Sequence, residues 1–231
     1  MNPVLTPEQL EILQHLDGCT LANAVETFQK RLRNEGFVDH TVRCLFPHLP
    51  PMVGYAATIK IRGSAPAFAG PAYREGTDWW DYILSLPAPR VVVVQDVAEK
   101  PGLGSLIGAV HMNVLRTLHC IGAVTNGAVR NIPVAEKAGF HLFAGSVSVS
   151  HAYVHIIEFG QPVEIGGLKI QSGDLLHGDP HGVQSIPLDI AAQIPRVAAE
   201  IIAREQEIIT LCQSKDFSLE KLRAAIARRN F

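Results

Sequence analysis

The segment at 108–131, GAVHMNVLRTLHCIGAVTNGAVRN, constrains the fold of this chain more than any other. Before it, the β-branched run RVVVVQ at 90–95 predicts a buried strand, and KPGLGSLIG at 100–108 predicts a glycine-broken loop. Apolar residues at helical spacing then predict a helix over 109–120. The predicted buried face of that helix consists of Val110, Val114, Leu118 and Ile121. Strands and helices mix along the chain without a strict βαβ rhythm, which favours a layered α/β sandwich.

Near the end of this segment is an arginine, Arg130. After the predicted helix, a strand over 123–125 runs into Asn126-Gly127, a strong turn signal, and the chain reaches Arg130. The backbone N–H groups at the start of the helix point toward the glycine loop. With the positive end of the helix dipole, they are suited to hold a carboxylate or a phosphate. These N–H groups and a guanidinium facing them would form a substrate site.

Several motifs, in order, resemble those of one known family. Gly108, the stretch NGAV at 126–129 and Arg130 follow its signature, Gly-(Glu/Asp)-x-x-Ala and, further along, Asp-Gly-Ala-x-Arg-Asp. The likeness continues in GFHLFAGSVSVS at 139–150 and in GDLLHGDPHGVQSIP at 173–187. On these motifs the chain resembles the ribonuclease-activity regulator A proteins and the 4-hydroxy-4-methyl-2-oxoglutarate aldolases.

The resemblance implies a fold, an assembly and a chemistry. The fold would be an α/β layered sandwich with a central mixed β-sheet flanked by helices and a C-terminal helical extension. The assembly would be a homotrimer or homohexamer with sites between subunits. The aldolases imply a carbon–carbon lyase that cleaves or decarboxylates a small 2-keto acid, with a divalent metal, Mg or Mn, as cofactor. The name-giving members instead regulate an RNA-degrading enzyme by binding it.

Two acids of the family's metal site are absent from this chain. Ala109 stands where family aldolases carry a carboxylate, and Asn131 stands where they carry a metal-binding aspartate. Magnesium prefers charged oxygen ligands, and the amide oxygen of Asn131 can coordinate the ion without neutralising it. Asn131 is therefore a weak candidate ligand, and we expect a metal site that is altered or lost.

Arg130 and His111 are the candidate catalytic residues. A guanidinium stays protonated and offers a planar fork to a carboxylate or keto acid, so Arg130 would bind substrate; otherwise it would pair with a surface carboxylate. His111, in the first helical turn, would act as a general acid or base, or would simply face solvent. The candidate substrate-binding residues are Gly108, Ala109, Val110, His111 and Arg130.

A second group of residues offers an alternative metal site. His177, Asp179 and His181 alternate in sequence, so on an extended segment their side chains share one face and supply nitrogen and oxygen ligands. Pro180 interrupts this pattern. The alternative site therefore depends on how the chain turns after Asp179.

Composition and motif spacing argue against several classes of partner. The formal net charge is −2 and the basic residues are scattered, so we expect no nucleic-acid surface. The N-terminus is polar and no apolar run approaches membrane-spanning length, so we expect a cytoplasmic protein without a membrane segment. The glycines at 102 and 104 imitate a dinucleotide-binding loop, but with the wrong spacing and no following acid, so we expect no nucleotide cofactor.

Length and apolar content predict one α/β domain over 1–231. The chain has 231 residues, of which 47% are hydrophobic, enough to bury a sizeable core. Within it we expect N-terminal helices over 1–33, an α/β core over 52–187 and C-terminal helices over 188–231. Trp79 and Trp80, in a predicted helix, would line a pocket, the core or a subunit interface.

Three functions remain open from the sequence. The first is a lyase acting on a small 2-keto acid. The second is a non-catalytic regulatory protein of the ribonuclease regulator type, which the missing metal acids favour. The third is a different reaction in the same pocket, carried out by its histidines.

Overall fold

A computed structural model describes residues 4–67 and 77–227 of the chain. The final residues of the expected C-terminal helical segment, 228–231, lie outside the described residues. Within the described ranges, none of the helices has the length and apolar character needed to cross a membrane.

A mixed sheet forms the centre of the protein and confirms the predicted architecture. Its parallel strands are β2 (Met52–Arg62), β3 (Arg90–Asp96), β4 (Cys120–Val129) and β5 (His141–Val147). Its antiparallel strands are β1 (Arg43–Cys44), β6 (His155–Phe159), β9 (Leu175–Asp179) and β10 (Gly182–Ile186). The strand order is β1-β5-β4-β3-β2-β9-β10, and β6 pairs with the second half of β2.

The valine run of β3 shows why both faces of this sheet are covered. Successive side chains of a strand point to opposite faces, and the residues at 91–94 are all buried. Val92 and Val94 join a core with helices α3 (Asp78–Leu84), α4 (Ala109–Thr117) and α5 (Ile132–Lys137). Val91 and Val93 join a core with the hairpin of β7 (Val163–Ile165) and β8 (Leu168–Ile170), whose turn is Gly166-Gly167.

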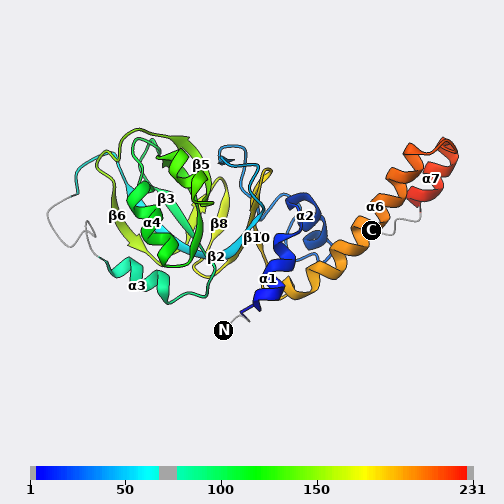
Figure 1. Cartoon of the computed structure of the whole chain (residues 1–231), viewed down its shortest axis with the longest axis horizontal. Coiled ribbons are helices and arrows are strands. Elements are labelled where there is room, and N and C mark those ends of the chain that lie inside the picture. The colour runs from blue at the N-terminus through cyan, green and yellow to red at the C-terminus, as the bar shows by residue number, and fades with distance from the viewer. Residues whose placement is uncertain (1–3, 68–76, 228–231) are drawn as a thin grey trace.

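The terminal helices pack at the β2–β9–β10 side of the sheet. They are α1 (Pro7–Gln14), α2 (Gly18–Glu26), α6 (Ile194–Gln213, after a 3-10 turn at Ala191–Gln193) and α7 (Leu219–Ala227). Leu13, Leu21 and Ile194 join Val53 and Leu175 in a third core. Figure 1 shows α1 and α2 beside β10, with α6 and α7 extending away from the sheet. α6 packs on α2 and α7, but Ile194 and Ala198 are its buried residues, so much of the surface of this extension is exposed.

The turn predicted at Asn126-Gly127 is wrong. Both residues lie inside β4, where the pairing with β5 shifts register between Thr125 and Ala128. The Asn126 side chain pairs with the backbone of Asp96: Oδ1 accepts from the N–H at 2.8 Å and Nδ2 donates to the C=O at 3.0 Å. Contacts with the neighbouring strands therefore override the local turn preference.

The predicted buried face of the helix after the glycine loop is also wrong. The buried residues of α4 are Met112 and Leu115, whereas Val110 is 76% exposed. The helix ends at Thr117, and Cys120 already belongs to β4. How a helix lies on the sheet determines which of its faces is buried. Apolar residues lie on more than one face of α4, so their spacing alone did not show which face that is.

Candidate functional site

Arg130 lies at the carboxyl edge of the parallel strands, directly after β4. Its backbone N–H donates to the Ile107 carbonyl at 3.2 Å, and Ile107 forms a parallel bridge with Val129. The loop between β3 and α4 is thereby held beside the end of β4. In open α/β sheets, ligands bind in the crevice at this edge.

Asp96, which the sequence analysis missed, organises that loop. Its side chain is buried, and its carboxylate accepts from the N–H groups of Ala98 at 3.0 Å and Gly102 at 2.9 Å. Gly102 has a φ of +91°, a left-handed conformation that glycine adopts without strain. The signal available in the sequence was an acid directly after the buried run RVVVVQ.

The Arg130 side chain lies against Gly108 at the start of α4. A Cβ added to Gly108 would lie 2.8 Å from Arg130 Nε, so a larger residue at 108 would displace the guanidinium from this position. Arg130 Nε is buried and has no hydrogen-bond partner among the described residues. A buried charged donor without a partner is costly, and a ligand that accepts from it would remove that cost.

Asn131 changes the anion site expected at the start of α4. It has left-handed backbone angles (φ 58°, ψ 42°), and its Oδ1 accepts from the Ala109 N–H at 3.1 Å. Asn131 therefore occupies the first N–H group of the helix. The backbone N–H groups of Val110 and His111 are not used by this contact. They are the donors of the expected anion site that remain available to a ligand.

His111 contacts an aromatic ring and lies within electrostatic range of Arg130. Its ring centroid is 6.1 Å from that of Trp79, with the planes tilted by 40°. Burial, and then the charge of Arg130, lower the pKa of His111 below its ordinary value of 6.5. The imidazole is therefore neutral at pH 7, the form that accepts a proton. The structure brings the two candidate catalytic residues together.

The alternative metal site at His177, Asp179 and His181 is not formed. His177 is buried and its Nε2–H donates to the Leu16 carbonyl at 2.9 Å. The Asp179 carboxylate accepts from the N–H groups of Gly18 at 2.7 Å and His181 at 2.9 Å, and contacts His181 Nδ1 at 3.1 Å. These bonds hold the turn before α2 against the β9–β10 hairpin.

The hairpin and Arg130 also lie at opposite ends of the sheet. Gly178, next to Asp179, pairs with Met52 at the start of β2, whereas Arg130 follows the end of the parallel strand β4. The two sets of candidate ligands therefore cannot form one site within a chain.

The residues near Arg130 do not fit a magnesium or manganese site. Ala109 has no ligand atom, and the oxygen of Asn131 is already bonded to the Ala109 N–H. Within residues 4–67 and 77–227, no group of three or more His, Cys, Asp or Glu side chains is placed to hold a metal ion.

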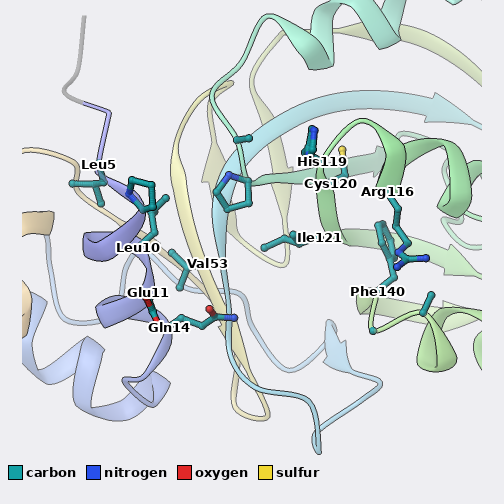
Figure 2. A pocket seen from close by; sticks show the side chains of 15 residues that line it. Leu5, Leu10, Glu11, Gln14, Val53, Arg116, His119, Cys120, Ile121 and Phe140 are labelled. Atoms are coloured by element: carbon teal, nitrogen blue, oxygen red, sulfur yellow. The ribbon is translucent and has the colours of Figure 1, made fainter.

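An open cavity of about 790 Å³ lies at the amino edge of the parallel strands. Figure 2 shows residues of α1, such as Leu10, on one side, and Ile121 of β4 and Phe140, which directly precedes β5, on the other. Cys120 also lines it, and burial raises the pKa of its thiol to about 12, so the thiol is unreactive at neutral pH. This cavity is separate from Arg130, which is at the other edge of the sheet.

The sheet and the residues at its carboxyl edge define an α/β protein with a basic site suited to a small anion. The chain belongs to the RraA-like family, described as Aldolase/RraA, whose model matches residues 19–184. A protein of Halalkalibacterium halodurans, provisionally named a 4-hydroxy-4-methyl-2-oxoglutarate aldolase, is 26% identical over 189 residues, covering 78% of this chain and 90% of the relative.

Two solved structures share the fold. An uncharacterized protein from Pseudomonas syringae pv. tomato has a TM-score of 0.74 at 22% identity, covering 97% of this chain and 96% of its own. RraAS2 of Streptomyces coelicolor, described as an unusual member of the RNase ES inhibitor RraA protein family, has a TM-score of 0.67 at 18% identity. It covers 90% of this chain and 98% of its own.

Proposed function

We propose that the chain is a lyase that binds a small 2-keto acid at Arg130 and cleaves or decarboxylates it. The observation that carries this proposal is the buried Nε of Arg130, which lies against Gly108 without a hydrogen-bond partner among the described residues. Membership of a family that includes a named aldolase supports the class of reaction.

The substrate would bind through two groups of donors. Its carboxylate would accept from the N–H groups of Val110 and His111, while its keto oxygen would accept from the Arg130 guanidinium. Negative charge develops on that oxygen when the neighbouring carbon–carbon bond breaks. A fixed guanidinium stabilises this charge more than it stabilises the neutral ketone, which lowers the barrier.

His111 would move the proton. In aldol cleavage of 4-hydroxy-4-methyl-2-oxoglutarate, neutral His111 takes the proton of the C4 hydroxyl, the C3–C4 bond breaks, and its electron pair forms the enolate of pyruvate. The other fragment leaves as a second pyruvate, and His111 returns the proton to C3 of the enolate. In oxaloacetate decarboxylation, carbon dioxide leaves instead and the enolate takes its proton from water.

The test is pyruvate release from both substrates by the purified wild-type protein, with and without EDTA. We expect turnover that survives EDTA, because the residues beside Arg130 do not form a metal site. The variant carrying Ala109→Glu and Asn131→Asp restores both acids and should respond to magnesium or manganese. Loss of wild-type turnover in EDTA and recovery with zinc or manganese would contradict the metal-independent mechanism.

A regulatory binding function is the second candidate. The missing acids at 109 and 131 favour it, and one structural neighbour belongs to a family described as an RNase ES inhibitor. If the wild type and the double variant both fold but release no pyruvate, the lyase proposal fails. Inhibition of an RNase E-type ribonuclease by the wild-type chain would then support the regulatory function.

We also propose that the chain assembles as a homotrimer or a dimer of trimers. The terminal extension exposes large apolar side chains, which a partner subunit would cover. These side chains are Ile202, Ile209, Phe217, Leu219 and Ile226. Light scattering at micromolar concentration should give a mass of three or six chains, and a monomer would contradict the proposal.

A further inference from the structure

Trp79 connects the core of the protein to the candidate site. It is the second residue of α3, and its side chain is only 3% exposed. It packs in the same core as Met112 and Leu115, the buried residues of α4. The indole is therefore held firmly by packing, and any group that rests on it is held as well.

His111 lies at the boundary between the core and solvent. In the first turn of α4 it follows Val110, which is 76% exposed, and precedes Met112, which is buried. Other rotamers of a side chain at this boundary would point into water. Instead its ring lies against Trp79 and is half-buried, close enough to Arg130 for that charge to act on it.

We propose that Trp79 is a positioning residue, which keeps the His111 imidazole beside Arg130 and away from water. Its catalytic meaning rests on the proposed function, because a positioned base is useful only if substrate binds at Arg130. A displacement of about 1 Å in a catalytic group can lower a rate by about a hundredfold. The contact therefore deepens the lyase proposal by naming a residue outside the substrate-binding segment.

Among the described residues, the charged groups to consider around His111 are Arg130 and two aspartates of α3. Arg130, at the end of β4, is the charge that acts on its pKa. Asp78 and Asp81 of the neighbouring helix α3 are exposed to solvent, which screens their charges. A change in the titration of His111 after substitution of Trp79 thus reports the exposure of the ring and its distance from Arg130.

The first experiment follows His111 by NMR in protein labelled with ¹³C-histidine, using His111→Ala to assign its signal. In the wild type the titration midpoint should lie below the ordinary value of 6.5. In Trp79→Leu it should rise toward that value, because water reaches the ring. Trp80→Phe, which changes the next residue of the same helix, should leave it in place. An unchanged midpoint in folded Trp79→Leu would overturn the proposal.

The second experiment is a double-mutant cycle on pyruvate release from oxaloacetate. In the protein with His111 intact, Trp79→Phe should lower kcat/KM about tenfold. This loss is smaller than the one expected from a fully misplaced base, because phenylalanine retains part of the ring contact. In the His111→Ala background the same substitution should have little effect, because the group that it positions is gone. Equal losses in both backgrounds would show a purely structural role and overturn the proposal.

The two experiments separate failure of this inference from failure of the proposed function. Absence of turnover in the wild type would remove the lyase proposal, and the NMR titration would still decide whether Trp79 holds His111. If Trp79→Leu does not fold, Trp79→Phe retains most of the buried apolar surface and is used for the titration instead.

Discussion

Two arginines at opposite ends of the parallel strands differ in what their side chains bind. Arg90, at the start of β3, is buried, and its guanidinium donates to the carbonyls of Leu84, Leu86 and Leu118 at 2.5–3.2 Å. Arg130, after the end of β4, has a buried Nε with no partner among the described residues. Arg90 joins the ends of α3 and α4 to the sheet, whereas Arg130 keeps a donor available.

This difference is why we propose a structural role for Arg90 and a ligand-binding role for Arg130. Arg90 is buried, whereas Arg130 is half-buried with a buried Nε, so the hydrogen bonds distinguish the two side chains better than burial does. His177 Nδ1, at the β9–β10 hairpin, is also buried without a partner, but it belongs to a neutral ring at the other end of the sheet from Arg130. An unpaired cationic donor at the carboxyl edge, where open α/β sheets bind their ligands, is the combination on which we base the candidate site.

The largest expected effect is on the stability of the Arg90→Lys variant. One ammonium group cannot reach all three carbonyls, and each hydrogen bond from a charged group is worth about 1.5–3 kcal/mol, so a variant that loses two of them should lose about 4 kcal/mol of unfolding free energy. Urea denaturation measures this loss. The affinity of the folded variant for oxalate should stay unchanged. A loss of oxalate affinity without a loss of stability would contradict the purely structural role of Arg90.

A second effect at the amino edge depends on pH. Burial lowers the pKa of His141, the first residue of β5, to about 4 from its ordinary value of 6.5. Between these two values the unfolded chain binds more protons than the folded one, so stability should fall by about 3 kcal/mol as pH drops from 6.5 to 4. Denaturation midpoints across this range measure the slope. The His141→Phe variant should show a weaker dependence of stability on pH. An equal pH dependence in that variant would mean that another group causes it.

At the carboxyl edge, Arg130→Lys should affect binding instead of stability. The charge remains, but a point charge cannot replace a two-pronged contact, so about 1.5–3 kcal/mol of binding should be lost. Oxalate or pyruvate affinity by calorimetry should fall about ten- to a hundredfold. The unfolding free energy should stay near that of the wild type. Unchanged affinity together with a large loss of stability would make Arg130 a second structural arginine.

The smallest expected effect is at Asn131. Asn131→Gly keeps the left-handed backbone but removes the oxygen that accepts from the Ala109 N–H, which should cost about 1 kcal/mol of stability. Asn131→Asp retains an acceptor and is the matched control. Thermal denaturation of the three proteins measures the difference. A loss in Asn131→Asp as large as in Asn131→Gly would argue against this hydrogen bond.

Local sequence was sufficient for much of the fold. The buried strand predicted at 90–95 and the mixture of strands and helices along the chain depend on neighbouring residues, and the structure contains both. The family motif also placed Arg130 beside the start of α4. Its backbone contact with Ile107 and its close approach to Gly108 join the two ends of one continuous segment.

What only the tertiary structure decided depends on residues far apart in sequence. Asn126-Gly127 is strand because β5 pairs beside it and because the Asn126 side chain binds the backbone of Asp96. His177 and Asp179 bind backbone groups of Leu16 and Gly18, and Trp79 contacts His111 only when α3 and α4 pack together. Side-chain types and spacing do not specify such contacts, because their energies depend on the geometry that the whole chain adopts.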